Sequence, residues 1–215
     1  FLHVQAVLNA LGHVAEAGGV AVDTEGGHLR AVRRFPHKGG EGNFSVFTHF
    51  GLVPAALMGI DLRKFLGQGI ASDLQSRKKV PYPANPNLML GLVLAEAAKR
   101  GKDKLTFIAE GFAGSLVPWL EQLIAESSGK EGKGILPIEN EPVLIGKTYL
   151  PDRVFVYFKT DGSQARLAEA QKASGHVVIT IAISEPYALA REFYRWEYAT
   201  AIACAVLKVN AFDQP

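Results

Sequence analysis

Residues 104–138 read KLTFIAEGFAGSLVPWLEQLIAESSGKEGKGILPI, and this stretch decides the fold class. It opens on the apolar run KLTFIA, typical of a buried strand, and continues into GSLVPWLEQLIAES, whose apolar residues recur at helical spacing. After a Ser-Ser-Gly loop with two further glycines, GILPI turns apolar again and predicts a second strand. A strand, a helix and a strand in this order are typical of a βαβ unit with parallel strands.

The same alternation continues on both sides of this unit. Further helices are predicted over 62–79, 87–100, 163–173 and 186–209, and further strands over 153–158 and 176–183. Apolar strands that alternate with helices require a mostly parallel sheet covered on both faces. The sequence therefore predicts an α/β fold, a three-layer sandwich around a mostly parallel sheet.

The first 60 residues are less regular. They predict a helix over 3–17, a strand over 19–23, a helical turn over 29–34, a glycine-rich loop over 35–50 and a helix over 51–60. Asp61 is a suitable N-cap for the helix that follows, and the prolines of VPYPANP at 80–86 predict an extended connector after it. Because ligands bind beyond the carboxyl ends of parallel strands, the loops after Ala109 and after Glu126 are expected at that edge.

Composition and charge exclude several classes of protein. The 215 residues, 48% hydrophobic and 20% charged, suit a globular domain, and a net charge of +2 spread along the chain argues against nucleic-acid binding. Cys204 is the only cysteine, and its apolar helical surroundings favour a buried, inert thiol in a reducing compartment. The longest uncharged helical run, YATAIACAVL, is about half the length of a membrane span. No secretory signal is visible at the start of the sequence. The sequence begins at Phe1 without a methionine, which predicts a fragment or a processed form.

Four common functional motifs do not occur. The loop over 127–134 fails the P-loop pattern at both ends, and the Gly18-Gly19 pair precedes a strand where a dinucleotide-binding fingerprint would follow one. The six histidines show no HExxH and no close pairing, so no zinc site is predicted, and no G-x-S-x-G supports a serine hydrolase.

Glu126 is the residue that the quoted stretch singles out for chemistry. A carboxylate near a helix C-terminus is disfavoured by the helix macrodipole, by about a few tenths of a kcal/mol. The same dipole, with partial burial, would raise the pKa of Glu126 toward the range useful to a general base. On the residues alone, a solvated acid at a helix end is the more common case.

Four stretches, in order, resemble the glucose-6-phosphate isomerase family. AESSGKEGKG at 125–134 resembles the E-S-x-G-K segment that carries the family's catalytic glutamate, here Glu126. GNFSVFTHFGLVPAALMGID at 42–61 resembles the G-G-R-[FY]-S signature with its G-L-x-P-A helix, and NLMLGLVLAEAAKRGKDKLTFIAEG at 87–111 resembles the helix and strand between these motifs. EFYRWEYATAIACAVLKVNAFDQP at 192–215 resembles the C-terminal helix and N-P-F-D-Q-P segment of bacterial members. The likeness covers about 40–215 and points to the isomerase half of fused transaldolase/glucose-6-phosphate isomerase proteins.

This resemblance implies a sugar-isomerase (SIS) type domain that interconverts glucose 6-phosphate and fructose 6-phosphate through a cis-enediol, without metal or organic cofactor. Glu126 would move the proton between the first and second sugar carbons, and His176 is the candidate for the ring-opening histidine. The substrate would be lined by Gly42, Asn43, Ser45, Ser127, Lys130 and Gln214. Family members dimerise with their sites near the interface, so a cytoplasmic homodimer is expected.

The resemblance also divides the chain and leaves two alternatives open. Residues 1–40 would be the remnant of a preceding sugar-isomerase domain with its linker, and 41–215 the C-terminal sugar-isomerase domain. Three features of the family are absent from the sequence: Asn43 replaces the signature arginine, no catalytic lysine follows F-D-Q-P, and no S-x-S-G-T-T phosphate loop occurs. Arg33, Arg34 or Lys38 could supply the positive charge of the missing arginine. The alternatives are therefore a sugar phosphate binding or regulatory module without turnover, and a half-domain that functions only with its upstream domain.

Overall fold

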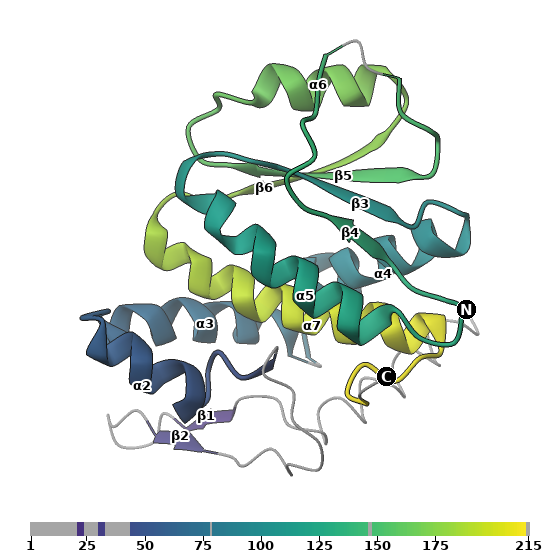
Figure 1. Ribbon diagram of the computed structural model, residues 1–215. Helices are drawn as coiled ribbons and strands as arrows, with labels where there is room; N and C mark the ends of the chain where they lie inside the picture. The colour runs from purple at the N-terminus through teal and green to yellow at the C-terminus, as the bar shows by residue number, and fades with distance from the viewer. Residues whose placement is uncertain (1–20, 24–29, 33–43, 78, 146–147, 214–215) are drawn as a thin grey trace.

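A four-stranded parallel sheet forms the centre of the computed structural model (Figure 1). The structure describes residues 21–23, 30–32, 44–77, 79–145 and 148–213. The strand order is β4 (Leu136–Ile138), β3 (Lys104–Ala109), β5 (Arg153–Lys159) and β6 (Val177–Ala182). In the register, Lys104 at the start of β3 lies opposite both Leu136 and Arg153. The predicted parallel sheet is confirmed.

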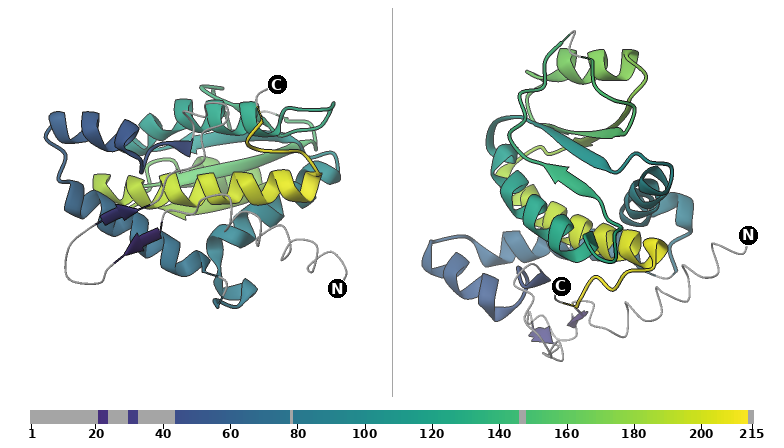
Figure 2. Two further views of the ribbon diagram at one scale, coloured as in Figure 1. Left: turned by 90° about the horizontal axis from the view of Figure 1, so that it is seen from below. Right: turned by 45° about the vertical axis from the view of Figure 1, so that its right-hand side comes forward.

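Helices cover both faces of this sheet, as the sequence predicts. On one face lie α4 (Pro86–Lys99), α5 (Val117–Ser128) and α7 (Leu189–Leu207), while α6 (Ala165–Ala173) covers the other (Figure 1). A further helix, α3 (Leu62–Ser76), packs against α7 on the side away from the sheet, and α2 (His49–Leu57) lies beside α3 (Figures 1 and 2). No helix of the described residues has the length and apolar character to cross a lipid bilayer.

The core follows the alternation of side chains along the central strands. Val154, Val156 and Phe158 of β5 belong to the large cluster beneath α4, α5 and α7, while Phe155 and Tyr157 belong to a smaller cluster beneath α6. Trp196 of α7 is fully buried against the large cluster. Both faces of the central strands are therefore dry, which explains why their sequences are apolar runs with no polar alternation.

Two of the predictions for the first 35 residues can be compared with the structure. A strand, β1 (Ala21–Asp23), lies within the predicted 19–23. The helical turn predicted over 29–34 is wrong, because Arg30–Val32 forms a second strand, β2, that pairs antiparallel with β1. Cross-strand pairing satisfies backbone groups that an isolated three-residue helical turn would leave without partners. The helix predicted over 3–17 and most of the loop over 35–50 lie outside the described residues.

Capping residues set the helix ends on either side of the proline-rich connector. Asp61 caps α3 as predicted, since its Oδ1 accepts hydrogen bonds from Arg63 N (3.0 Å) and Lys64 N (3.2 Å). Asn85 caps α4 in the same way, accepting from Leu88 N at 2.9 Å, and Pro86 fills the first helical position. The connector is not wholly extended, because Tyr82–Ala84 forms a 3-10 turn. Such a turn tolerates Pro83, whose fixed φ suits helical geometry.

The loops after Ala109 and after Glu126 lie at opposite edges of the sheet, whereas the sequence predicts both at the carboxyl edge. The loop after Ala109 leaves the carboxyl end of β3, as predicted. The loop after Glu126 lies at the opposite, amino edge, because α5 runs back along the sheet and Leu136, after that loop, pairs with the first residue of β3. The C-terminus of α7, which follows β6, returns to the same amino edge. A site built on the Glu126 loop therefore lies beyond the ends of α5 and α7.

Candidate functional site

Three segments that are far apart in the sequence meet beyond the ends of α5 and α7. They are Phe44–Ser45, Glu126–Lys130 and Asn210–Asp213, which we call the candidate site. The rings of Phe44 and Phe212 lie 5.1 Å apart between centroids, and Lys130 Nζ donates to the carbonyl oxygen of Asn210 at 2.7 Å. Figure 1 shows the C-terminal coil turning back beneath the last turns of α5 and α7. The fold thus brings together parts of three of the stretches that resemble the isomerase family, those at 42–61, 125–134 and 192–215.

Glu126 lies in the last turn of α5 with its side chain exposed. Gln122, one turn earlier, donates from Nε2 to Glu126 Oε1 at 3.3 Å. Partial burial, the condition under which the helix dipole would raise the pKa of Glu126, is not met, because the apolar positions of α5 face the core and leave this position on the solvent side. The exposed carboxylate can be approached by a solute from outside the fold.

The two serines after Glu126 are buried and anchor the loop. Ser127 is 3% exposed, and its carbonyl oxygen accepts a bond from Cys204 Sγ at 3.4 Å. Ser128 Oγ donates to Ile124 O at 2.7 Å and accepts from Ile135 N at 2.9 Å. These contacts fix the start of the loop to α7 and its end to the approach of β4.

The loop between Ser128 and β4 needs a glycine at one position. Gly134 has φ of +142°, and a Cβ there would lie 3.0 Å from the carbonyl oxygen of Ser128. The glycine therefore allows the loop to fold back onto the end of α5. Glycine at this point is explained by close backbone approach within the loop.

Lys130 is half-buried and reaches away from the sheet. Its Nζ donates to the carbonyl oxygens of Asn210 and Asp213 in the C-terminal segment. Apolar contacts accompany this polar link, since Phe44 and Phe212 pack on the cluster of Cys204, Val209 and Ala211. Cys204 is buried as predicted, and burial raises the pKa of its thiol to about 12, which fits an inert thiol.

Ser45 marks the near end of the first segment. Its carbonyl oxygen accepts from Thr48 N at 2.9 Å and from Thr48 Oγ1 at 2.7 Å, which leads the chain into α2. The other predicted substrate contacts, Gly42, Asn43 and Gln214, lie outside the described residues, as do Arg33, Arg34 and Lys38. Their roles stay predictions.

His176 lies just before β6 and belongs to a different part of the molecule. Its ring is 5.2 Å from that of Phe155 and 6.2 Å from that of Tyr149, both in the cluster beneath α6. Burial, helped by the charges of Lys102 and Arg153, lowers the pKa of His176 below its ordinary value. Glu126 is on α5, on the other face of the sheet, so the fold of one chain does not bring these two residues together.

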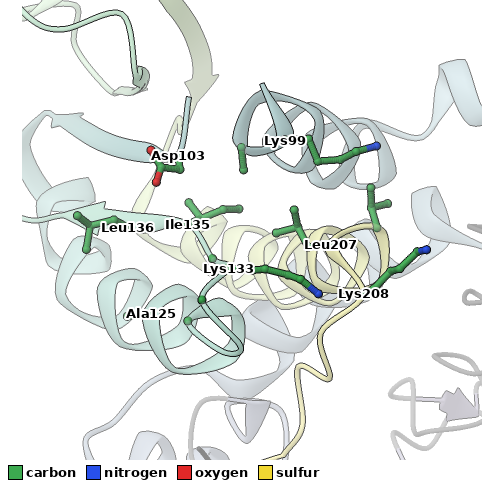
Figure 3. Close-up of a pocket in the computed structure, with 13 residues that line it drawn as sticks. Lys99, Asp103, Ala125, Lys133, Ile135, Leu136, Leu207 and Lys208 are labelled. Atoms are coloured by element: carbon green, nitrogen blue, oxygen red, sulfur yellow. The ribbon is translucent and has the colours of Figure 1, made fainter. Parts of the chain in front are cut away.

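A groove of about 670 Å³ lies beside the loop between α5 and β4 (Figure 3). It is bounded by the last turns of α4, α5 and α7, and its charged lining residues are Lys99, Asp103, Lys133 and Lys208. Three helix C-termini meet here, and lysines at such ends offset the negative end of each helix dipole. Neither Glu126 nor Lys130 lines this groove, but Gly129 between them does, so the groove adjoins the candidate site.

The structure buries three carboxylates, wholly or in part, that the sequence analysis does not predict: Glu110, Glu192 and Glu197. Glu110, 2% exposed, follows β3 directly and accepts hydrogen bonds from the backbone of the loop after β5. Its signal was available, because an acid at the carboxyl end of a buried strand needs donors from a neighbouring loop. Glu197 of α7 has an Oε1 that is buried without a hydrogen-bond partner among the described residues. Its burial could be predicted from its position four residues after Phe193, which places it on an apolar face of the helix.

The chain is similar to several curated glucose-6-phosphate isomerases. The enzyme of Heliobacterium modesticaldum is 28% identical over 221 residues, which cover 81% of this chain and 48% of that protein. Those of Parabacteroides distasonis and Methanocaldococcus jannaschii are 34% and 36% identical over 105 and 100 residues, each match covering 45% of this chain. These relatives support an isomerase family. No protein-family model matches the chain.

The comparison with solved structures bears on the fold. A crystal structure of a hypothetical protein from Thermus thermophilus superposes with a TM-score of 0.69 at 21% identity, covering 81% of this chain and 52% of that one. The α/β fold is therefore shared with a protein of known structure. The chain spans about half the length of the curated relatives that match it over most of its residues. A fusion to a transaldolase stays a prediction.

Proposed function

We propose that this chain carries the proton-transferring part of a glucose-6-phosphate isomerase. One observation carries the proposal: the exposed carboxylate of Glu126 lies in the last turn of α5, and the loop that follows is bound to the C-terminal segment, which in turn packs on Phe44. These are the segments that resemble the family's base, C-terminal and signature motifs. The relatives named glucose-6-phosphate isomerase support the same reaction.

The proposed chemistry is a proton transfer through a cis-enediol. After the sugar ring opens, Glu126 takes a proton from one carbon and returns it to the neighbouring carbon on the same face, a task that a single carboxylate can perform. Gly42, Asn43, Ser45 and Gln214 line the sugar in this proposal, with the backbone of Ser127 close to it. His176 would act in ring opening at a site formed with another copy of the chain, since it is remote from Glu126 in its own chain.

The proposal includes partners. The site would be completed by a preceding sugar-isomerase domain that holds the phosphate group and by a second copy of the chain in a homodimer. The cytoplasm is the proposed location, and the place in metabolism is glycolysis and gluconeogenesis. No nucleic acid or membrane partner is proposed.

A second candidate function is a sugar phosphate binding module without turnover. Asn43 favours it, because an amide donates a hydrogen bond but cannot supply the charge with which the family's arginine would stabilise an enediolate. Removal of such a charge-assisted contact costs several kcal/mol in the transition state, about 3 kcal/mol for one oxyanion donor.

A coupled assay tests the proposal, with fructose 6-phosphate supplied and glucose 6-phosphate detected. We expect Glu126→Gln to lower kcat by at least about 100-fold, since the amide cannot accept the proton. Glu131→Gln is the matched control, because Glu131 is an exposed acid of the same loop whose ion pair is with Lys133. Calorimetric binding of fructose 6-phosphate separates the candidates. Binding with no turnover in the parent chain, alone or with the upstream domain added, would favour the module and contradict the isomerase.

A further inference from the structure

The ammonium group of Lys130 joins two parts of the candidate site that are 80 or more residues apart in sequence. We propose that Lys130 is a positioning residue, which fixes segment 210–213 against the loop that follows Glu126 and the end of α5. The contact itself is independent of any activity. Its effect on turnover rests on the isomerase function proposed above.

The donors and acceptors of this contact match. A lysine ammonium has three N–H donors, and two of them are directed at the carbonyl oxygens of Asn210 and Asp213. Hydrogen bonds from a charged donor are stronger than neutral ones. One cation therefore holds both ends of a four-residue segment.

The C-terminal segment has few other polar contacts with the part of the chain that the structure describes. α7 ends at Lys208, whose left-handed backbone (φ 60°) turns the chain away, and Val209 N closes the helix on Cys204 O at 3.0 Å. Phe212 N then donates to the side chain of Asn210 within the segment itself, at 3.0 Å. Phe212 packs on Phe44 and Ala211 is buried in the cluster of Cys204, and Lys130 adds polar contacts to these apolar ones.

The same loop contains a matched control. Lys133 is exposed, three residues after Lys130, and its Nζ pairs with Glu131 at 3.4 Å within the loop. It has the same charge and length as Lys130 but makes no contact with 210–213 among the described residues. Any effect of general loop charge would appear equally in Lys130→Met and Lys133→Met.

Hydrogen–deuterium exchange of the full chain tests the contact directly. In Lys130→Met we expect the peptide covering 208–213 to exchange at least about tenfold faster than in the parent, because local opening there costs less. Lys130→Arg, which keeps a cation with several donors, should restore most of the protection, and Lys133→Met should match the parent. Unchanged exchange of this peptide in Lys130→Met, in a sample whose circular dichroism is native, would overturn the proposal.

Kinetics distinguish positioning from direct substrate binding. If the parent chain turns over, Lys130→Met should lower kcat by about 10- to 100-fold and leave KM within about threefold, as expected when a reacting group is misplaced. A raised KM with unchanged kcat would instead make Lys130 a substrate ligand and overturn the positioning role. If the parent is inactive even with the upstream domain added, the proposed function fails, and the exchange experiment alone decides the role of Lys130.

Discussion

At the scale of single residues, Glu110 is the most informative side chain outside the candidate site. Its carboxylate accepts hydrogen bonds from Tyr157 Oη and from the backbone amides of four residues in the loop after β5: Thr160, Asp161, Gly162 and Gln164. Burial alone would raise the pKa of Glu110, but these donors hold it far below its ordinary value. The ionised carboxylate thus ties the carboxyl end of β3 to the loop between β5 and α6.

We expect Glu110→Gln to lower the free energy of unfolding by about 3 kcal/mol, because the amide loses the charge and turns its own NH₂ group toward backbone donors. Urea denaturation at pH 7 measures this loss. Glu169→Gln, at an exposed position of α6, is the control and should change stability by less than about 0.5 kcal/mol. Equal effects in the two variants would mean that the network contributes little.

The pH dependence of the same residue has a defined sign. Since the pKa of Glu110 is lower in the folded state, its contribution is complete above the unfolded pKa of about 4.3 and is lost as the pH falls below that value. The parent should therefore lose more stability than Glu110→Gln between pH 5 and pH 3.

At the scale of elements, the contact between α4 and α7 depends on a glycine. A Cβ at Gly91 would lie 2.6 Å from the carbonyl oxygen of Ala199 and 2.7 Å from Ile202 Cβ. The two helices therefore touch backbone to backbone, and neither neighbour can move without shifting α7.

Gly91→Ala should destabilise the protein by about 2 kcal/mol through overpacking, although alanine favours a helix. Gly67→Ala, in α3, is the matched control, because a Cβ there would meet nothing within 4 Å. It should raise stability by about 0.5–1 kcal/mol through the lower entropy of the unfolded chain. Chemical denaturation of both variants checks the pair. A stabilised Gly91→Ala would show that α4 and α7 are not in close contact.

The elements themselves could be predicted from sequence wherever the signal was local. Strand β3 is predicted correctly from a run of apolar residues, and the Asp61 cap is predicted correctly from an acid that directly precedes a helix. Helix α5 was predicted to start at 114 but begins at Val117, because a 3-10 turn over Gly111–Leu116 precedes it. The strand β2 was missed because its evidence is a pairing with β1, and pairing is not visible in three residues.

The candidate site was predictable only in part for the same reason. Glu126 could be placed near a helix end from local pattern, but its exposure depends on which face of α5 the core takes. The edge of the sheet on which its loop lies follows from strand register, and the partners of Lys130 are 80 or more residues away. Long-range contacts of this kind leave no trace in a local pattern.

At the scale of the whole molecule, α7 contains buried acids whose response to pH is opposite to that of Glu110. Glu192 is 2% exposed, and burial raises its pKa to about 7 although Arg195, with its Nε at 3.1 Å, and Arg191 lower it in part. Glu197 is partly exposed, but its Oε1 is buried, and burial raises its pKa to about 8. A central helix that contacts α3, α4 and α5 thus contains two acids whose protonated forms are favoured up to neutral pH.

The contribution of these two acids to the stability of the folded protein is therefore larger at pH 5 than at pH 8. An acid whose pKa is higher in the folded state holds its proton while the unfolded chain has lost its own, so stability falls as the pH rises from about 4.3 to the folded pKa. As the pH falls below about 4.3, Glu110 loses its charge and the free energy of unfolding decreases. Glu197→Gln mimics the protonated acid, so the difference in unfolding free energy between pH 5 and pH 8 should shrink by about 3 kcal/mol in this variant. Urea titrations of the parent and the variant at both pH values measure that difference, and an equal pH dependence in the two would mean that Glu197 is ionised and solvated in the folded protein.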